Sequence, residues 1–217
     1  MNSNYFVFCE QLNSVIEKYS NLFIREVNGK KYLKGILDIP NDNNEIIKSF
    51  AIEIHFKDGF PYRFPNLKEV GYDIPNDADW HKYTNGNCCI TVEPEEILIC
   101  RFGITLLTFI EQHAIPYFAN QIHKKEFGFY KNGEYAHGFS GLKQFYSSLF
   151  QTNDESRWVY YTKIVFKNFP LHIQRNDKCF CGSNKKFKHC HNIVFNQMRI
   201  IGLKQIVNDL KINIDET

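Results

Sequence analysis

The spacing of apolar residues is helical at the start of the chain. Between residues 5 and 19 they recur at steps of three and four: Tyr5, Phe8, Leu12, Val15, Ile16 and Tyr19. This spacing places them on one face of a helix, so the sequence predicts an amphipathic first helix.

The next segments have an alternating pattern. Residues 22–27 and 32–39 flank the pair Asn28-Gly29, a strong signal for a β-hairpin. Residues 46–56 alternate apolar with mostly polar side chains, which predicts a third strand with one solvated face. A fourth short strand is predicted over residues 67–70, after a segment (60–65) whose two prolines exclude regular strand pairing.

Helical spacing returns in the second half of the chain. Residues 71–96 are predicted to be irregular, and a helix is predicted from Phe102 onward with a break or kink at Pro116. Further helices are predicted over residues 142–150, 155–169 and 194–210. The order of elements indicates an α+β fold: a helix, a four-stranded antiparallel meander, and then helices.

Composition supports one main domain with an appendage. The chain has 217 residues, of which 43% are hydrophobic and 16% aromatic, enough for one core of about 150 residues. Apolar periodicity stops near residues 168–177. We therefore expect a main domain over 1–150, a helical connector over 151–175, and a metal-binding segment with a terminal helix over 176–217.

Charge and cysteine usage narrow the class of protein. A net charge of +2 gives no reason to expect binding to nucleic acid or an anionic membrane. The seven cysteines show no spacing typical of a disulfide framework. The first residues lack the features of a signal peptide, and no stretch is long enough to span a membrane. These features predict a soluble cytoplasmic protein.

The densest chemical pattern lies near the end of the chain. Three thiols and an imidazole occur within thirteen residues: Cys179, Cys181, Cys190 and His191. Four sulfur or nitrogen ligands suit a tetrahedral structural zinc, and Gly182 with Ser183 can form the turn after the first pair. Buried inert cysteines are the alternative, but the interleaved lysines make this a poor core segment. We predict a structural zinc site.

Residues 176–191 resemble the SEC-C motif. This zinc knuckle occurs at the C-terminus of the translocation ATPase SecA and as an appendage on many bacterial proteins. The resemblance implies zinc and a docking element whose partner differs from host to host. It implies nothing about catalysis, which must be sought upstream.

A second candidate site lies in the segment Trp80-His81-Lys82-Tyr83-Thr84-Asn85-Gly86-Asn87-Cys88-Cys89. Cys89 lies in a polar loop outside any hydrophobic period, where the carbonyl of another molecule could reach its sulfur. Acyl transfer at a thiol needs a donor for the developing oxyanion and an acceptor for the amine proton. Asn85 and Asn87 are the nearest side-chain donors, and backbone N–H groups around Gly86 are the alternative.

Together with Phe60-Pro61-Tyr62-Arg63-Phe64-Pro65, this loop resembles the ubiquitin-conjugating enzyme family, over roughly residues 1–150. The family has Gly-x-aliphatic-Cys, so Cys89 matches its thioester-forming nucleophile. Its usual His-Pro-Asn is replaced here by His81, Lys82 and Tyr83, and the loop is two residues shorter than the common eukaryotic form. The short loop, with residues 127–130 and 134–138, resembles a bacterial branch found in antiphage operons.

The resemblance implies a transferase that carries a protein C-terminus as a thioester on Cys89 and passes it to an amine. It implies an activating enzyme and a ubiquitin-like or nucleotidyltransferase protein as partners. The matching histidine of the family is mostly structural, which favours a bracing role for His81 over proton handling. His137 either approaches the loop or caps a helix near Ser140.

Other functions remain open from the sequence alone. Cys89 could be a buried, inert thiol on a noncatalytic adaptor of the same fold. It could also serve a Cys-His hydrolase together with His81 or His137. Residues 176–217 could act as a nucleic-acid hook, which salt-sensitive binding would reveal.

Overall fold

The computed structural model describes residues 3–131, 133–166 and 173–212. The chain forms two compact units. The first comprises residues 1–91 and 99–134, and the second comprises residues 92–98 and 135–217. Because the described residues include a four-stranded antiparallel sheet and many helices, the predicted α+β class is confirmed.

The first unit begins with two short helices, α1 (Ser3–Glu10) and α2 (Leu12–Lys18), where a single helix was predicted. The chain breaks at Gln11, whose side-chain oxygen accepts the backbone N–H of Leu106 at 2.7 Å. The predicted apolar face is nevertheless the buried one, because Phe8 and Val15 are fully inside the core.

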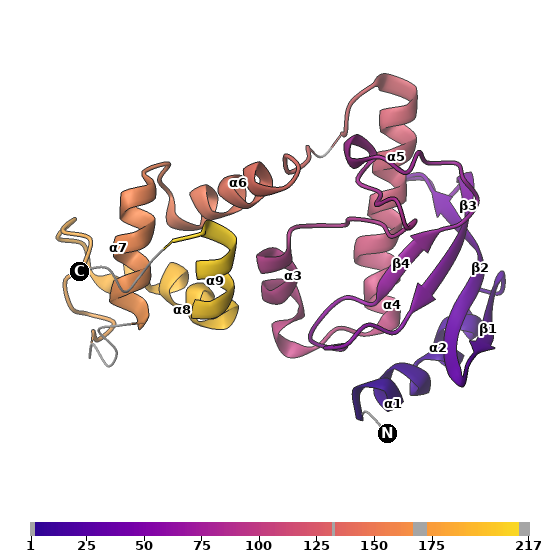
Figure 1. Ribbon diagram of the computed structural model, residues 1–217, viewed down its shortest axis with the longest axis horizontal. Coiled ribbons are helices and arrows are strands. Elements are labelled where there is room, and N and C mark those ends of the chain that lie inside the picture. The colour runs from indigo at the N-terminus through magenta and orange to yellow at the C-terminus, as the bar shows by residue number, and fades with distance from the viewer. Residues whose placement is uncertain (1–2, 132, 167–172, 213–217) are drawn as a thin grey trace. The chain divides into compact units, whose positions relative to one another are not determined.

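The sheet is the predicted meander. It consists of β1 (Leu22–Val27), β2 (Lys30–Pro40), β3 (Ile46–His55) and β4 (Asn66–Glu69), and its strands lie in sequence order (Figure 1). Val27 pairs with Lys30 across the Asn28-Gly29 turn, as the hairpin signal predicts.

One face of the sheet carries the core of the first unit. Its buried side chains alternate along the strands: Leu33, Leu37, Ile39, Phe50, Ile52, Ile54 and Leu67. The opposite face is mixed: it includes the exposed side chains of Phe23 and Ile36, and Lys34 bonds to Glu53 across β2 and β3 at 2.9 Å. Phe118 of α5 (Ile115–Phe127) stacks on Phe50 with ring centroids 4.5 Å apart, so this helix covers the apolar face.

The helical segment after the irregular loop is nearly continuous. A 3-10 turn, η2 (Cys100–Phe102), precedes α4 (Leu106–Phe109), and a π-helical turn, η3 (Ile110–Ala114), joins α4 to α5. Pro116, where a break or kink was predicted, lies in the first turn of α5. Proline is tolerated there because the ladder is already irregular at the π turn and the missing N–H removes no regular bond.

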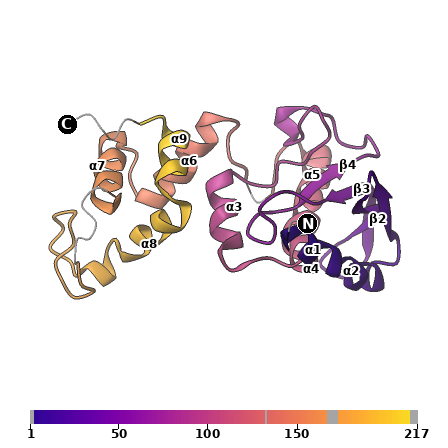
Figure 2. The ribbon, with the colours of Figure 1, turned by 60° about the horizontal axis from the view of Figure 1, so that its bottom comes forward.

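The second unit is helical. It contains α3 (Glu93–Ile99) except for its last residue, which belongs to the first unit. It also contains α6 (Phe139–Phe150), α7 (Glu155–Phe166), the 3-10 turn η4 (Phe187–His189), α8 (Asn192–Ile201) and α9 (Leu203–Leu210) (Figure 2). Residues 167–169 of the predicted helix 155–169 lie outside the described residues.

Two further predictions of secondary structure are wrong. The segment 71–96 is not wholly irregular, because it contains the 3-10 turn η1 (Ala78–Trp80) and the start of α3. Pro94 and the first-turn acids of α3 are favourable at a helix start, a signal that was missed. The predicted helix 194–210 is instead two helices, since Gly202 adopts a left-handed φ of 87° between α8 and α9.

The predicted division into 1–150, 151–175 and 176–217 also differs from the structure. The first unit ends at residue 134, and α6 belongs to the second. Residues of α6, α7, the cysteine segment and the last two helices share one core: Tyr146, Phe150, Trp158, Val165, Phe187, Val194, Met198 and Ile206. The cysteine segment is therefore integrated into a helical unit, because Phe180 packs against Tyr161 of α7 and Phe187 against Phe195 of α8.

Across the part of the chain that the structure describes, no helix combines the length and the apolar character needed to cross a membrane.

Candidate functional site

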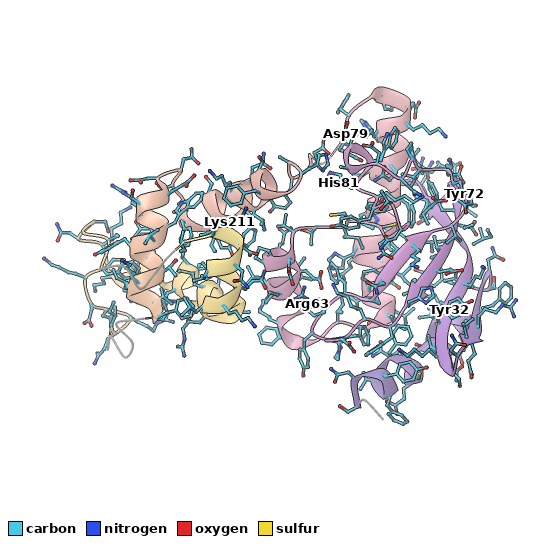
Figure 3. All side chains as sticks on the ribbon, viewed as in Figure 1. Tyr32, Arg63, Tyr72, Asp79, His81 and Lys211 are labelled. Atoms are coloured by element: carbon cyan, nitrogen blue, oxygen red, sulfur yellow. The ribbon has the colours of Figure 1, made fainter. Side chains whose placement is uncertain are left out.

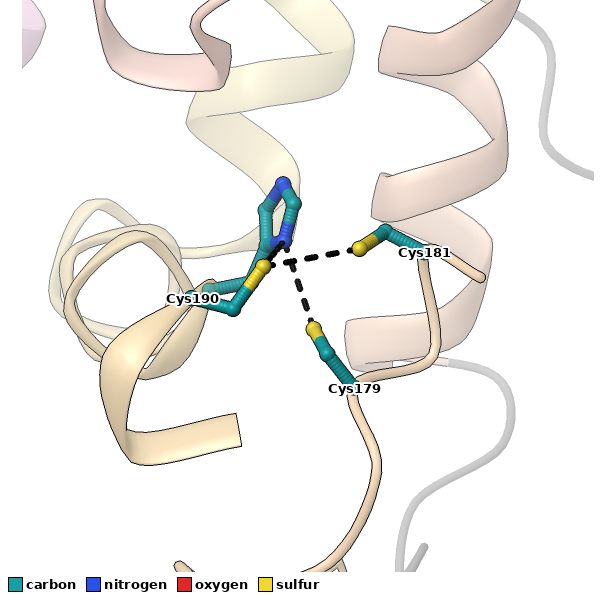
Figure 4. Close-up of side chains that lie close together, drawn as sticks. Cys179, Cys181 and Cys190 are labelled. Carbon is teal, nitrogen blue, oxygen red and sulfur yellow. Dashed lines mark hydrogen bonds between the residues drawn. The ribbon is translucent and has the colours of Figure 1, made fainter. Parts of the chain in front are cut away.

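The three cysteines and the histidine near the end of the chain converge on one point (Figure 4). Their ligand atoms all lie within 4.8 Å of one another. His191 Nδ1 is 3.3 Å from Cys179 Sγ and 3.1 Å from Cys190 Sγ, and Cys181 Sγ is 3.5 Å from Cys190 Sγ. The pairs come from two separate turns of the chain.

A small hairpin positions the first pair of thiols. Lys178 and Lys186 form an antiparallel bridge, and the N–H of Cys179 donates to the carbonyl of Lys185 at 2.8 Å. The chain then reverses, with the N–H of Gly182 donating to the carbonyl of Cys179 at 3.3 Å. The predicted turn after the first cysteine pair is thus present.

The second pair is positioned by a turn and a helix start. The N–H of Cys190 donates to the carbonyl of Phe187 at 3.0 Å, which closes η4. His191 is the residue before α8, and its carbonyl accepts the N–H of Phe195 at 2.9 Å. Its ring lies against Tyr161 and Phe180, with centroids 4.9 and 5.3 Å away, so the core of the second unit fixes its orientation.

These four groups fit a tetrahedral metal ion such as zinc. With metal–sulfur bonds of about 2.3 Å and metal–nitrogen bonds of about 2.0 Å, neighbouring ligand atoms of a tetrahedron lie roughly 3.5–3.8 Å apart. The three close contacts, at 3.1, 3.3 and 3.5 Å, are near these values, and all four ligand atoms lie within 4.8 Å of one another, so the cluster has about the size that an ion needs.

Protonation in the metal-free cluster is uneven. Burial raises the pKa of Cys179 to about 11. Burial also opposes ionisation of Cys181, but hydrogen bonds with Ser183, Cys190 and Cys179 together outweigh it and lower the pKa of Cys181 to about 7. Burial lowers the pKa of His191, which keeps its imidazole neutral and able to ligate. Metal binding would therefore displace protons mainly from the cysteines.

Cys89 lies on a second hairpin, in the first unit. Lys82 and Cys88 form an antiparallel bridge, the N–H of Tyr83 donates to the carbonyl of Asn87 at 2.9 Å, and the N–H of Cys89 donates to the carbonyl of His81 at 2.7 Å. Gly86 has a left-handed φ of 82°, which suits the last position of a short hairpin loop.

The two adjacent thiols have different environments. Cys88 packs against the core of the first unit, and burial raises the pKa of its thiol to about 12. Cys89 is partly exposed, and its sulfur accepts a hydrogen bond from the hydroxyl of Tyr83 at 3.5 Å. Successive side chains of an extended segment point to opposite sides, which accounts for this difference.

A buried ion pair lies under the same hairpin. Lys82 Nζ bonds to Glu69 at the end of β4 and donates to the carbonyl of Ile74 at 2.9 Å. The two side chains are 1% and 0% exposed. The pair ties the hairpin to the sheet.

Side chains of α5, together with Tyr130 just after it, hold the chain that leads into the hairpin. The hydroxyl of Tyr117 donates to the carbonyl of His81 at 3.0 Å, and Gln121 Nε2 donates to the carbonyl of Trp80 at 3.0 Å. The hydroxyl of Tyr130 donates to the carbonyl of Asp79 at 3.1 Å. Asp79 and His81 are labelled beside α5 in Figure 3. Three consecutive carbonyls are thus fixed by side chains.

The predicted catalytic residues occupy two segments of the chain. Cys89, His81 and Asn85 belong to the hairpin segment. His137 is exposed and lies two residues before α6, and its ring offers a ligand atom within 4.8 Å of those of His81 and Glu134. The ring of His81 bonds through Nε2 to Glu134 at 2.7 Å. Asn85 Oδ1 accepts the N–H of Asn87 at 3.0 Å, so this side chain helps to close the turn.

Sequence reasoning missed Tyr83, Lys82 and Glu69. Tyr83 could have been found from the pair Asn85-Gly86, because a hairpin turn there places Tyr83 near Cys89 on the facing arm. The Lys82–Glu69 pair carries no such signal, since both residue types are normally exposed.

Comparison with known proteins identifies one segment. The SEC-C motif matches residues 175–192, the segment that contains all four candidate metal ligands. Neither the curated proteins nor the solved structures contain a match to this chain.

Proposed function

We propose that the first unit is a cysteine-dependent acyltransferase of the ubiquitin-conjugating type, in which Cys89 carries the C-terminus of another protein as a thioester. The observation that carries this proposal is the presentation of Cys89: a partly exposed sulfur on a rigid hairpin, with a hydroxyl donor 3.5 Å away. The neighbouring thiol of Cys88 packs against the core, and burial raises its pKa to about 12, so it serves as an internal contrast.

The reaction would proceed in two exchanges. In the first, the Cys89 thiolate attacks an activated carbonyl carbon, a C–S bond forms, and the leaving group departs with its electron pair. In the second, an amine attacks the thioester, a C–N bond forms, and the C–S bond breaks. The amine proton passes to solvent and the released thiolate takes one up.

The order of elements supports the family assignment. The resemblance implies the order that is observed: a helical start, a four-stranded meander, a proline-rich crossing segment, a loop with His81 and Cys89, and covering helices. The support of residues 79–81 by side chains of α5 and by Tyr130, just after this helix, suits a site that must position a reacting carbonyl.

We further propose that the metal is zinc and that its role is structural. A Cys3His donor set is one that zinc takes in closed structural sites. The second unit would then be a docking module that recruits a partner, as the SEC-C resemblance implies. An activating enzyme, a ubiquitin-like or nucleotidyltransferase substrate, and a bacterial antiphage setting belong to the same proposal by analogy alone.

The test uses a small acyl donor and the full chain. The purified protein is incubated with a glycine-terminated peptide thioester of mercaptoethanesulfonate, and adducts are measured by intact mass spectrometry. We expect one adduct, lost in Cys89→Ala, kept in Cys88→Ala, and discharged as an amide when lysine is added. Absence of an adduct, or its persistence in Cys89→Ala, overturns the proposal and favours an adaptor.

A hydrolase predicts a different product. It would release the free peptide acid without added amine, as fast as lysine produces the amide. Chromatography of the released peptide separates these two outcomes.

A further inference from the structure

We propose that the hydroxyl of Tyr83 is the hydrogen-bond donor that stabilises the oxyanion formed on the acyl group bound to Cys89, and then the thiolate of Cys89 as it leaves. This inference rests on the proposed function and identifies a further catalytic residue for it. It starts from the contact between the Tyr83 hydroxyl and Cys89 Sγ at 3.5 Å.

The hairpin register explains why these side chains meet. Lys82 faces Cys88, and the Tyr83 N–H bonds to the carbonyl of Asn87, so Tyr83 and Cys89 are diagonal neighbours on facing arms. Diagonal neighbours on one face lie within reach of an aromatic side chain. Lys82 and Cys88 occupy the other face, which is buried.

The position of the Tyr83 hydroxyl also suits a reacting site. The residue is 56% exposed, so an incoming acyl group and amine can approach it. Its backbone is nevertheless fixed on both sides, because its N–H donates to Asn87 and its carbonyl accepts the N–H of Gly86 at 2.9 Å. A donor held in place before the reaction loses little in reorganisation.

The alternative backbone donors are already used. The N–H groups of residues 86–89 each have a partner: Gly86 donates to Tyr83, Asn87 to Asn85, Cys88 to Leu67 and Cys89 to His81. These groups cannot form the oxyanion hole without breaking the hairpin. The alternative in which backbone N–H groups around Gly86 supply the donor would therefore require these hydrogen bonds to break.

The other polar side chains near Cys89 have contacts elsewhere or are turned inward at their oxygen atoms. Asn85 Oδ1 closes the turn with the N–H of Asn87. Asn87 Oδ1 is buried and has no hydrogen-bond partner among the described residues. The ring of His81 is engaged with Glu134. The Tyr83 hydroxyl, in contrast, donates directly to the reacting sulfur, at 3.5 Å.

The same hydroxyl can serve two anions in sequence. When the amine attacks the thioester, the carbonyl π electrons move to oxygen, and the hydroxyl donates to that oxyanion. When the oxyanion collapses, the C–S bond breaks with its electron pair on sulfur, and the hydroxyl returns to the contact seen in the free thiol. The tyrosine keeps its proton throughout, so no acid or base is consumed.

The experiment compares Tyr83→Phe with the wild-type chain in single-turnover discharge. Each protein is loaded with the glycine-terminated peptide thioester, separated from excess donor, and mixed with lysine. We expect Tyr83→Phe to load on Cys89 and then to form amide about 100–1,000-fold more slowly, the usual effect of losing one oxyanion donor. The thermal midpoint of unfolding should be unchanged, because most of the side chain is exposed.

Two further variants make the test specific. Site-specific 3-fluorotyrosine at position 83 retains the hydroxyl and should discharge near the wild-type rate. If Tyr83 acted only by packing, Tyr83→Phe and 3-fluorotyrosine would discharge at the same rate. Tyr72→Phe, which removes the hydroxyl of an 87% exposed tyrosine outside the hairpin, should discharge at the wild-type rate. An unchanged rate in Tyr83→Phe overturns the inference while leaving the transferase proposal intact, whereas failure of the wild-type chain to load removes both.

Discussion

Lys82 and Glu69 form an ion pair under the hairpin that carries Cys89, and both side chains are almost fully removed from solvent. Lys82 is the residue next to His81 in sequence, and Glu69 ends β4. The pair therefore joins the reactive loop to the sheet through buried charge. Such a pair is sensitive to the loss of either partner, because the remaining charge stays buried.

We predict that Lys82→Met lowers the free energy of unfolding of the first unit by about 3–5 kcal/mol, because it leaves Glu69 without its partner. Urea denaturation followed by Trp80 fluorescence in a Trp158→Phe background measures this unit alone. The double variant Lys82→Met/Glu69→Leu should recover most of the loss. Equal stability of the single variant and the parent would contradict the buried-pair interpretation.

The two adjacent thiols should react at different rates. Burial raises the pKa of Cys88 to about 12, so little of it is thiolate near pH 8, and its sulfur packs against the core. We predict that iodoacetamide modifies Cys89 before Cys88 in the native protein. Mass spectrometry of Cys88→Ala and Cys89→Ala separates the two rates, and faster reaction in Cys89→Ala would reverse the assignment.

Removal of the metal should unfold one unit and spare the other. The cysteine segment shares its core with α6 to α9, so we expect chelation to unfold the second unit as a whole rather than the segment 176–217 alone. The chain has two tryptophans, and Trp80 lies in the first unit while Trp158 lies in the second.

Each tryptophan can therefore report on one unit. In Trp80→Phe, chelator should abolish the folded fluorescence of Trp158, and added zinc should restore it. In Trp158→Phe, the melting curve of Trp80 should not respond to chelator. A response in both variants would mean that the two units unfold together.

His113 should make the first unit less stable in acid. Its ring packs on Phe64 with centroids 4.6 Å apart, and burial lowers its pKa from 6.5. The unfolded state then binds the proton more readily than the folded state. The contribution of His113 to the free energy of unfolding is therefore fully present above pH 6.5 and is lost as the pH falls below that value.

The measurement compares denaturation of the parent and His113→Gln across this range. The variant should be less stable at neutral pH because it loses the contact with Phe64, but it should lose less stability on acidification. Parallel pH profiles would exclude a contribution from His113.

The sequence was most informative where patterns are local. Alternation and the Asn28-Gly29 pair located the strands to within a few residues, and the cysteine spacing located the metal cluster. Both signals depend on residues close together in the chain. The helix boundaries at Gln11 and Gly202 were harder to predict. The first depends on a hydrogen bond from the Leu106 N–H to the Gln11 side chain, and the second on the positive φ of Gly202.

Features that depend on distant residues could not be predicted in this way. The pairing of Tyr146 with Asp209 at 2.8 Å helps to join α6 to α9, across the boundary drawn from the loss of periodicity. The burial of Lys82 likewise requires Glu69 and Ile74, which are apart from it in sequence. Periodicity reports which face of an element is apolar but not which element covers it.

The placement of α3 has a practical consequence for dissecting this protein. Residues 92–98 belong to the second unit although they are encoded within the first, so no single cut in the gene separates the two. A stop codon after residue 134 would retain α3 without its packing partners and leave Val92 and Leu98 uncovered. A soluble fragment would need that helix replaced by a short polar connection.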